Sequence, residues 1–262
     1  MPAERQTIPT SRGYGLASSL ELPAGPAWGA AVFAHCFTCT QQSKAAVEIT
    51  RRLARAGIAS LRFDFTGLGK SEGEFGRAGF AIDVADLVDA GRFMIGRCGG
   101  PLLLVGHSLG GAAVLAAADD LGFDAIAGIA TIGAPADVSH VLERIEGDLE
   151  AIRTTGEGDV SIGGRAFRLA REFLERIEHI DLLAEVARLR VPLLFMHSPT
   201  DNLVSVENAG ALFAAAMHPK SFVSLEGAGH LLLDGDDAAY AAGIIAAWAS
   251  RYLGEGEFPP GR

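Results

Sequence analysis

A serine between two glycines is the residue of this chain best placed to do covalent chemistry. Residues 106–110 read GHSLG, a G-x-S-x-G pattern centred on Ser108. The pattern is common by chance, but here an apolar run typical of a buried strand precedes it and a helix-forming run, residues 112–118, follows it. A strand, a sharp turn and a helix lift a serine hydroxyl above the edge of a sheet. We therefore predict that Ser108 is a nucleophile; an ordinary serine in a glycine-rich turn is the alternative.

A base and an acid for this serine follow in later loops. A serine hydroxyl is a poor nucleophile until a base takes its proton. Asp201 follows the apolar run 192–197, and His230 follows the apolar run 221–225. Loops at the carboxyl ends of parallel strands meet at one edge of a sheet, so these side chains are expected to converge. The order nucleophile, acid, histidine is the one found with this type of turn. The sequence thus predicts a triad of Ser108, His230 and Asp201.

Acyl transfer also needs hydrogen-bond donors for the oxyanion that develops on the substrate. One donor is expected to be the backbone N–H of Leu109, directly after the nucleophile. The second is expected from the loop after the early apolar run 29–34, and by position it is the N–H of Phe37. Losing one such donor costs about 3–4 kcal/mol of transition-state stabilisation. The prediction is an oxyanion hole made of two backbone groups.

Two cysteines flank Phe37 with the spacing C-x-x-C. Such a pair can mark a redox motif near a βαβ pattern, where it usually begins a helix. Here Cys36 and Cys39 lie in a loop, some residues before the expected helix at Ser43. We interpret them as incidental buried thiols, with a redox role as the alternative. Three cysteines in all, the third being Cys98, fit a reducing compartment better than a disulfide scaffold, so a cytoplasmic location is expected.

The remaining histidines give no sign of a metal site. His107 flanks the serine but should point away from it on the turn, so a packing role is expected. His197 ends a strand and should form a local hydrogen bond. None of the histidines has metal-ligand spacing with a second histidine or cysteine, and we predict neither a metal nor a cofactor. The other three lie in helical or loop sequence: His140, His179 and His218.

Composition narrows the classes of partner. The 262 residues are 49% apolar and 21% charged, which is globular composition. A net charge of −10, with no basic run longer than two residues, argues against nucleic acid. Residues 98–118 carry no charge over a length that could span a membrane. Their polar centre favours a buried strand followed by a buried helix instead. We expect a soluble protein with a small-molecule ester substrate and no membrane association; a homodimer is left open.

The wider pattern predicts the elements that position these residues. Apolar runs alternate with helical periods, which indicates a mostly parallel sheet with crossover helices. Helical stripes run over 46–56, 84–95 and 240–248. Residues 13–22 should add one or two antiparallel strands at a sheet edge. The strand candidates are residues 29–34, 58–65, 101–106, 125–132, 192–197 and 221–225.

One stretch departs from the alternation. Residues 136–190 are charged and mostly helical, with a short hairpin expected at 159–168. This is more chain than a crossover helix needs. We interpret it as a small helical cap over the site, inserted into a single domain of residues 1–262. Ordinary surface helices are the alternative.

These motifs together resemble the α/β-hydrolase superfamily over about residues 13–253. The match lies in the serine motif, the loop at residues 35–37, the run 64–73, Asp201 and His230. It implies an α/β-hydrolase fold, a mostly parallel doubly wound sheet flanked by helices.

More narrowly, segments 34–39, 62–67 and 197–201 resemble the hydrolase part of bifunctional proteins that join an α/β hydrolase to an OsmC-family (osmotically inducible protein C) domain. Many relatives have glycine where this chain has Cys36, so the backbone of the oxyanion loop could differ here.

The expected reaction is acyl transfer to water. Ser108 attacks a carbonyl, His230 accepts the proton, Asp201 holds the imidazolium, and water hydrolyses the acyl-enzyme. The resemblance implies a carboxylic ester before an amide or thioester, and a small cap favours a short acyl chain. Two alternatives stay open: a cofactor-free perhydrolase or haloperoxidase that uses the same triad with peroxide, and a non-catalytic ligand-binding scaffold.

Overall fold

Strands of five to seven residues build the central sheet, and the inner strands are mostly apolar and buried. The computed structural model describes residues 3–177 and 180–254, and within them eight strands form one sheet in the order β1-β2-β4-β3-β5-β6-β10-β11. The six strands from β4 to β11 run parallel, and β2 runs antiparallel to both its neighbours. The strands are β1 (Glu4–Pro9), β2 (Gly15–Glu21), β3 (Gly29–Ala34), β4 (Ile58–Phe63), β5 (Leu102–His107), β6 (Ile126–Ile132), β10 (Leu193–His197) and β11 (Lys220–Ser224).

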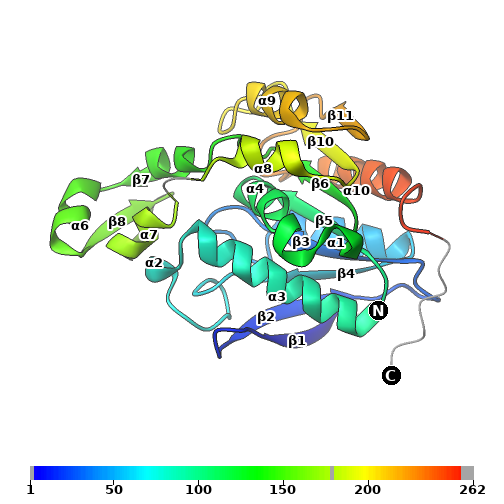
Figure 1. Cartoon of the computed structure of the whole chain (residues 1–262), viewed down its shortest axis with the longest axis horizontal. Helices are drawn as coiled ribbons and strands as arrows, with labels where there is room; N and C mark the ends of the chain where they lie inside the picture. The colour runs from blue at the N-terminus through cyan, green and yellow to red at the C-terminus, as the bar shows by residue number, and fades with distance from the viewer. Residues whose placement is uncertain (1–2, 178–179, 255–262) are drawn as a thin grey trace.

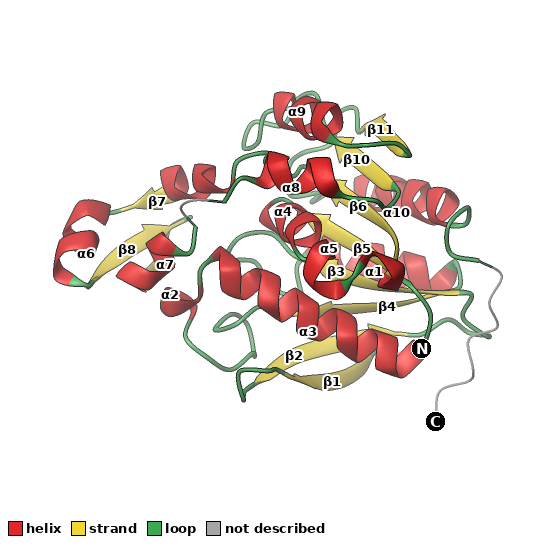
Figure 2. Ribbon diagram, in the orientation of Figure 1, coloured by secondary structure: helices red, strands yellow, loops and turns green. Residues whose placement is uncertain are grey.

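Both faces of this sheet are covered by helices (Figures 1 and 2). Successive side chains of a strand point to opposite faces, so Leu102 and Leu104 enter one apolar cluster while Leu103 and Val105 enter the other. All four are at most 1% exposed, which is why the strand reads as continuously apolar. One face carries α1 (Lys44–Arg55) and α10 (Gly235–Ala249); the other carries α3 (Phe80–Cys98), α4 (Leu109–Ala116), α8 (Leu182–Arg188) and α9 (Glu207–Ala215).

The fold confirms the predicted α/β-hydrolase class, and the six predicted strands of the parallel part are all present within a residue or two. The first strand, Glu4–Pro9, was not predicted. Only Ile8 of this strand is buried, because the strand lies at the outer edge of the sheet. Its sequence therefore lacks the apolar alternation from which strands are predicted.

The uncharged stretch 98–118 divides between the end of α3, the strand β5 and the helix α4. No helix in the described ranges is both long and apolar enough to cross a membrane.

Between β6 and β10 the chain leaves the sheet and forms a smaller unit beside it, drawn in green at the left of Figure 1. We call residues 138–175 the cap segment. Its antiparallel sheet has the order β7-β8-β9, and the hairpin Ile162↔Arg165 turns through Gly163 and Gly164, both at positive φ. The elements are η2 (Val138–Arg144), β7 (Ile145–Glu146), α6 (Leu149–Thr155), β8 (Glu157–Ile162), β9 (Arg165–Ala170) and α7 (Arg171–Glu175).

The cap segment is more β-rich than the predicted helical cap of residues 136–190. Two glycines at positive φ form the tight two-residue turn that joins antiparallel strands, so the hairpin extends to both sides of the expected 159–168. At the other end of the predicted range, α8 packs against α4 on the main sheet and is a crossover helix. The short helix α2 (Phe75–Ala78) contacts β9 and α7 and joins the cap segment to the sheet.

Candidate active site

The turn between β5 and α4 has the shape that the glycine pattern predicts. Ser108 adopts φ 55°, a left-handed backbone that costs energy for any residue with a Cβ. A Cβ on Gly106 would lie 2.2 Å from the carbonyl oxygen of Gly110, and a Cβ on Gly110 would lie 2.4 Å from that of Ala34. Only glycine fits at either position. The tight turn lifts the serine hydroxyl out of the sheet at the carboxyl end of β5.

The three predicted triad residues lie together. Nε2 of His230 is 3.0 Å from Oγ of Ser108, and Nδ1 is 2.6 Å from Oδ2 of Asp201. A carboxylate can only accept, so Nδ1–H donates to Asp201 and Nε2 is left to accept the serine proton. The His230 and Asp201 side chains are 5% and 2% exposed. The geometry is that of a nucleophile, a base and an orienting carboxylate.

Asp201 is held as a carboxylate. Burial alone would raise its pKa, but hydrogen bonds from the side chains of His197 and His230 and from two backbone N–H groups outweigh burial and lower the pKa. The N–H groups are those of Leu203 and Val204, each 2.9 Å from Oδ1. His197 also forms the expected local hydrogen bond, at 2.8 Å to the carbonyl oxygen of Val204. The negative charge is thus available to orient His230 and to balance an imidazolium.

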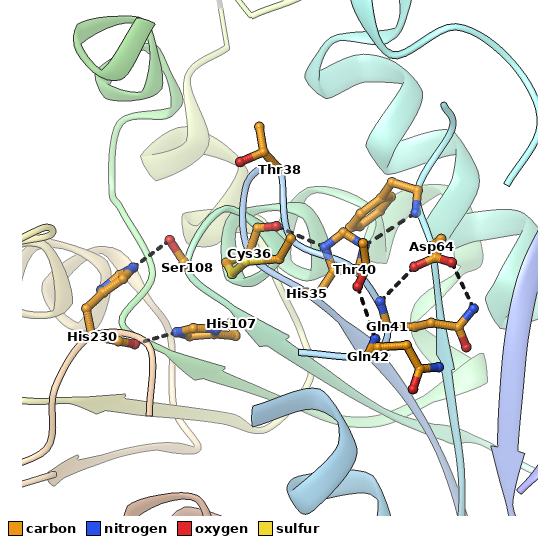
Figure 3. The surroundings of a disulfide bond; sticks show 12 residues. His35, Cys36, Thr38, Thr40, Gln41, Gln42, Asp64, His107, Ser108 and His230 are labelled. Carbon is orange, nitrogen blue, oxygen red and sulfur yellow. Dashed lines mark hydrogen bonds between the residues drawn. A yellow bond between two sulfur atoms is a disulfide. The ribbon is translucent and has the colours of Figure 1, made fainter. Parts of the chain in front are cut away.

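His107 holds the backbone of the triad histidine, His230. It is 1% exposed, and its Nε2–H donates to the carbonyl oxygen of His230 at 2.7 Å (Figure 3). Burial, aided by the nearby His230, lowers the pKa of His107 to about 4. The residue is therefore a neutral donor at neutral pH. Sequence reasoning assigned it only a packing role, since the acceptor is a backbone carbonyl far along the chain.

The two predicted oxyanion donors border the same cavity as Ser108. Leu109 is the first residue of α4, where helix N–H groups have no intrahelical acceptor. Within the described ranges, neither its N–H nor that of Phe37 has a hydrogen-bond acceptor. Both groups are free to donate to a substrate oxygen.

The loop that carries Phe37 is a tight turn. The N–H of Cys39 donates to the carbonyl oxygen of Cys36 at 3.0 Å, and Nδ1–H of His35 donates to the same oxygen at 2.9 Å. Thr38, the third residue of the turn, has φ 55°. Downstream, the Asp64 carboxylate accepts the backbone N–H of Gln41 at 2.7 Å (Figure 3). The loop is therefore anchored at both ends.

The interpretation of Cys36 and Cys39 as separate thiols is wrong. The two form a disulfide, with Cα atoms 5.3 Å apart, directly beside Ser108 (Figure 3). The turn brings the two Cα atoms into the range that a disulfide requires. The C-x-x-C spacing was the available signal, and the expected absence of a helix there led us to discount it. Among the described cysteines only Cys98 is free.

The cavity in front of Ser108 has a volume of about 440 Å³. Its walls come from the oxyanion loop, from the loops that carry Asp201 and His230, and from the cap segment. The cap segment contributes the apolar residues Val141 and Ile162 and the polar or charged residues His140, Glu143, Arg144 and Glu146. In the part of the chain that the structure describes, no three His, Cys, Asp or Glu side chains gather as metal ligands would.

Comparison with known proteins shows the family to which the chain belongs. A family model, the alpha/beta hydrolase family, matches residues 31–243, so the chain belongs to that family. Among solved structures, the chain is similar to the esterase domain of a Rhodothermus marinus protein, with 46% identity, a TM-score of 0.78, and coverage of 97% of this chain and 100% of that chain.

A second similar structure is Est1E from Butyrivibrio proteoclasticus with bound ferulic acid. It shares 21% identity and a TM-score of 0.81, over 95% of this chain and 99% of that chain. At this identity the likeness concerns the fold alone. No curated protein matches the chain.

Proposed function

We propose that this protein hydrolyses carboxylic esters through an acyl-enzyme on Ser108. The observation that carries the proposal is the unbroken line of hydrogen bonds from Asp201 through His230 to Ser108, which opens into a cavity bordered by two free backbone donors. The esterase domain from Rhodothermus marinus, 46% identical to this chain, supports an ester over other acyl donors.

Each candidate residue has a defined step in the proposed reaction. Nε2 of His230 takes the hydroxyl proton as Oγ of Ser108 attacks the ester carbonyl carbon. The carbonyl oxygen gains negative charge, which the N–H groups of Phe37 and Leu109 stabilise. His230 then gives its proton to the departing alkoxide. Water, deprotonated by the same imidazole, attacks the acyl-enzyme, and the carboxylic acid leaves as Ser108 recovers its proton.

The cavity limits the size of the proposed substrate. Sites for small molecules commonly measure about 300–1,000 Å³, and the cavity here, at about 440 Å³, is at the small end of this range. We therefore propose esters with a short acyl chain and a small alcohol.

Two narrower proposals rest on sequence alone. The first is kinship with the hydrolase part of bifunctional hydrolase–OsmC proteins, from which no peroxidase activity is carried over. The second is a cytoplasmic location, drawn from the low number of cysteines. The disulfide between Cys36 and Cys39 weakens the second argument, because disulfides persist mainly in oxidising compartments.

A panel of chromogenic esters of graded acyl length tests the proposal. We expect the highest kcat/KM on the short acyl chains and a decline as the chain outgrows the cavity. A parallel assay follows peroxide-dependent halogenation of a reporter dye. Dye halogenation without ester cleavage would replace the proposal with the perhydrolase or haloperoxidase alternative. Neither activity, together with tight binding of an uncleaved ester, would favour the ligand-binding scaffold.

A further inference from the structure

The oxyanion loop holds a residue in a conformation that the loop alone does not favour. Thr38 is β-branched, yet its φ is 55°. A non-glycine residue in this region is strained and persists only where its surroundings hold it. The contacts that hold Thr38 therefore bear on the geometry of the neighbouring Phe37.

One of those contacts comes from the cap segment. Nη1 of Arg165 donates to the carbonyl oxygen of Thr38 at 2.8 Å, across 127 positions of sequence. Arg165 is the first residue of β9, directly after the tight glycine turn, so its backbone is fixed by the hairpin. Its guanidinium also lies over the ring of Phe167, 5.1 Å from the ring centre. Within the described ranges, no carboxylate pairs with it and competes for its donors.

Two hydrogen-bonded peptide groups, Thr38–Cys39 and Cys36–Phe37, connect this contact with the oxyanion donor, and we call them the oxyanion relay. The Thr38 carbonyl belongs to the same peptide group as the Cys39 N–H, and that N–H donates to the Cys36 carbonyl at 3.0 Å. The Cys36 carbonyl in turn belongs to the same peptide group as the Phe37 N–H. A cation at one end of such a chain orients and polarises each peptide group along it.

Aromatic packing runs alongside the relay. The ring of Phe167 lies 4.8 Å from that of Phe75, which lies 6.0 Å from that of Phe37. Phe173 of the cap segment also lies 6.5 Å from the ring of Phe37, so the cap segment contacts the oxyanion loop through this side chain as well as through the backbone of Thr38. Aromatic contact restrains where the loop lies but leaves the orientation of its peptide groups to the hydrogen bonds.

We propose that Arg165 is a positioning residue of the oxyanion hole, which it orients from the cap segment through the peptide groups of Thr38 and Cys36. The inference rests on the proposed function, since it assigns a role within the proposed ester hydrolysis. The cap segment then serves the chemical step in addition to enclosing the substrate.

The test compares Arg165→Ala and Arg165→Lys with a matched control on the same hairpin. The control is Arg168→Ala, because Arg168 pairs with the exposed carboxylates of Glu157 and Asp159 and makes no contact with the loop. We expect Arg165→Ala to lower kcat on a chromogenic short-chain ester about tenfold or more with little change in KM, as loss of transition-state stabilisation does. Affinity for a trifluoromethyl ketone, which forms an oxyanion on the serine, should fall by a similar factor.

Arg165→Lys should recover part of the loss, because an ammonium can donate to the same carbonyl, and Arg168→Ala should match the wild type. Thermal unfolding checks that each variant is folded; if Arg165→Ala does not fold, Arg165→Lys is compared alone with the control. Unchanged kcat and ketone affinity in an active enzyme, or a rise in KM alone, would overturn the role of Arg165. A wild type that neither cleaves esters nor binds the ketone would instead overturn the proposed function, and this inference with it.

Discussion

The two halves of the site are supported in different ways. Ser108, Asp201 and His230 lie in loops at the carboxyl ends of parallel strands and contact one another. Their further contacts are with adjacent backbone and with His107 and His197, the last residues of two strands of the sheet. The loop of Phe37 is held by a disulfide and a histidine of its own segment and by one distant contact, from an arginine of the cap segment 127 positions away. We therefore expect changes in the cap segment to alter the rate of chemistry through this loop, and we expect the triad to depend on the sheet.

The largest expected effect is on the triad half. Ser108→Ala should lower ester hydrolysis a thousandfold or more, because triad residues act as a unit. The fold should persist, since the change removes one hydroxyl and keeps the Cβ. Steady-state kinetics and a thermal melt measure the two outcomes. A folded variant that keeps half the activity would remove Ser108 from the mechanism.

The triad half should also set the pH dependence. His230 must be neutral to accept a proton, so protonation of its imidazole in acid should stop it from acting as the base. Activity should therefore rise from pH 5 to a plateau at higher pH. Burial lowers the pKa of His107 to about 4, so this histidine stays neutral over the whole window and adds no second step. A flat profile from pH 5 to 9, with chemistry rate-limiting, would contradict the role of His230.

A smaller effect is expected from the wall of the cavity. Val141 borders the cavity from the cap segment, and its aliphatic side chain cannot hydrogen-bond with the peptide groups of the oxyanion loop. Val141→Ala should shift the relative kcat/KM on longer against shorter acyl chains by about tenfold, the lower end of the range for one methylene in an apolar pocket. The rate on the shortest ester should change little. An unchanged order of preference would count against the cap segment as the wall that selects the acyl chain.

The smallest effect is expected from the disulfide. Changing Cys36 and Cys39 together to Ser removes the bridge but leaves the Cys39 N–H bond to the Cys36 carbonyl and the Arg165 contact in place. Activity should stay within about tenfold, equivalent to about 1.4 kcal/mol. The double variant should no longer respond to reductant or mild oxidant, and thiol titration confirms the loss of the bridge. A loss as deep as that of Ser108→Ala would make the bridge essential to the site.

The position of the triad could be predicted from the sequence, whereas the contacts that hold the oxyanion loop could not. The sequence predicted that Ser108, Asp201 and His230 would lie together, because parallel strands bring the loops at their carboxyl ends to one edge. Five strands of the parallel part were also predictable, since burial on both faces leaves a nearly continuous apolar run. The sixth, β11, lies at the sheet edge and is partly exposed, so its apolar run is shorter. The catalytic roles of these residues stay predictions until they are tested.

The contacts that hold the oxyanion loop in place could not be predicted from the sequence. The contact of Arg165 with Thr38 joins residues 127 positions apart through a backbone carbonyl, which has no side-chain signature in the sequence. The hydrogen bond from His107 to the carbonyl oxygen of His230 could not be predicted either, because its acceptor is also a distant backbone carbonyl. The disulfide had a visible spacing, but its formation depends on a turn whose third residue, Thr38, adopts a backbone conformation that its type disfavours.

Stoichiometric labelling with a fluorophosphonate tests the central claim most directly. The reagent phosphonylates an activated serine and forms an adduct that water releases very slowly, so adduct and residual activity can be measured on one sample. The account predicts that ester hydrolysis falls in proportion to one adduct per chain, that peptide mapping places the adduct on Ser108, and that Ser108→Ala takes up none. Full hydrolysis by a labelled chain, or an adduct on another residue that accompanies the loss of activity, would contradict it.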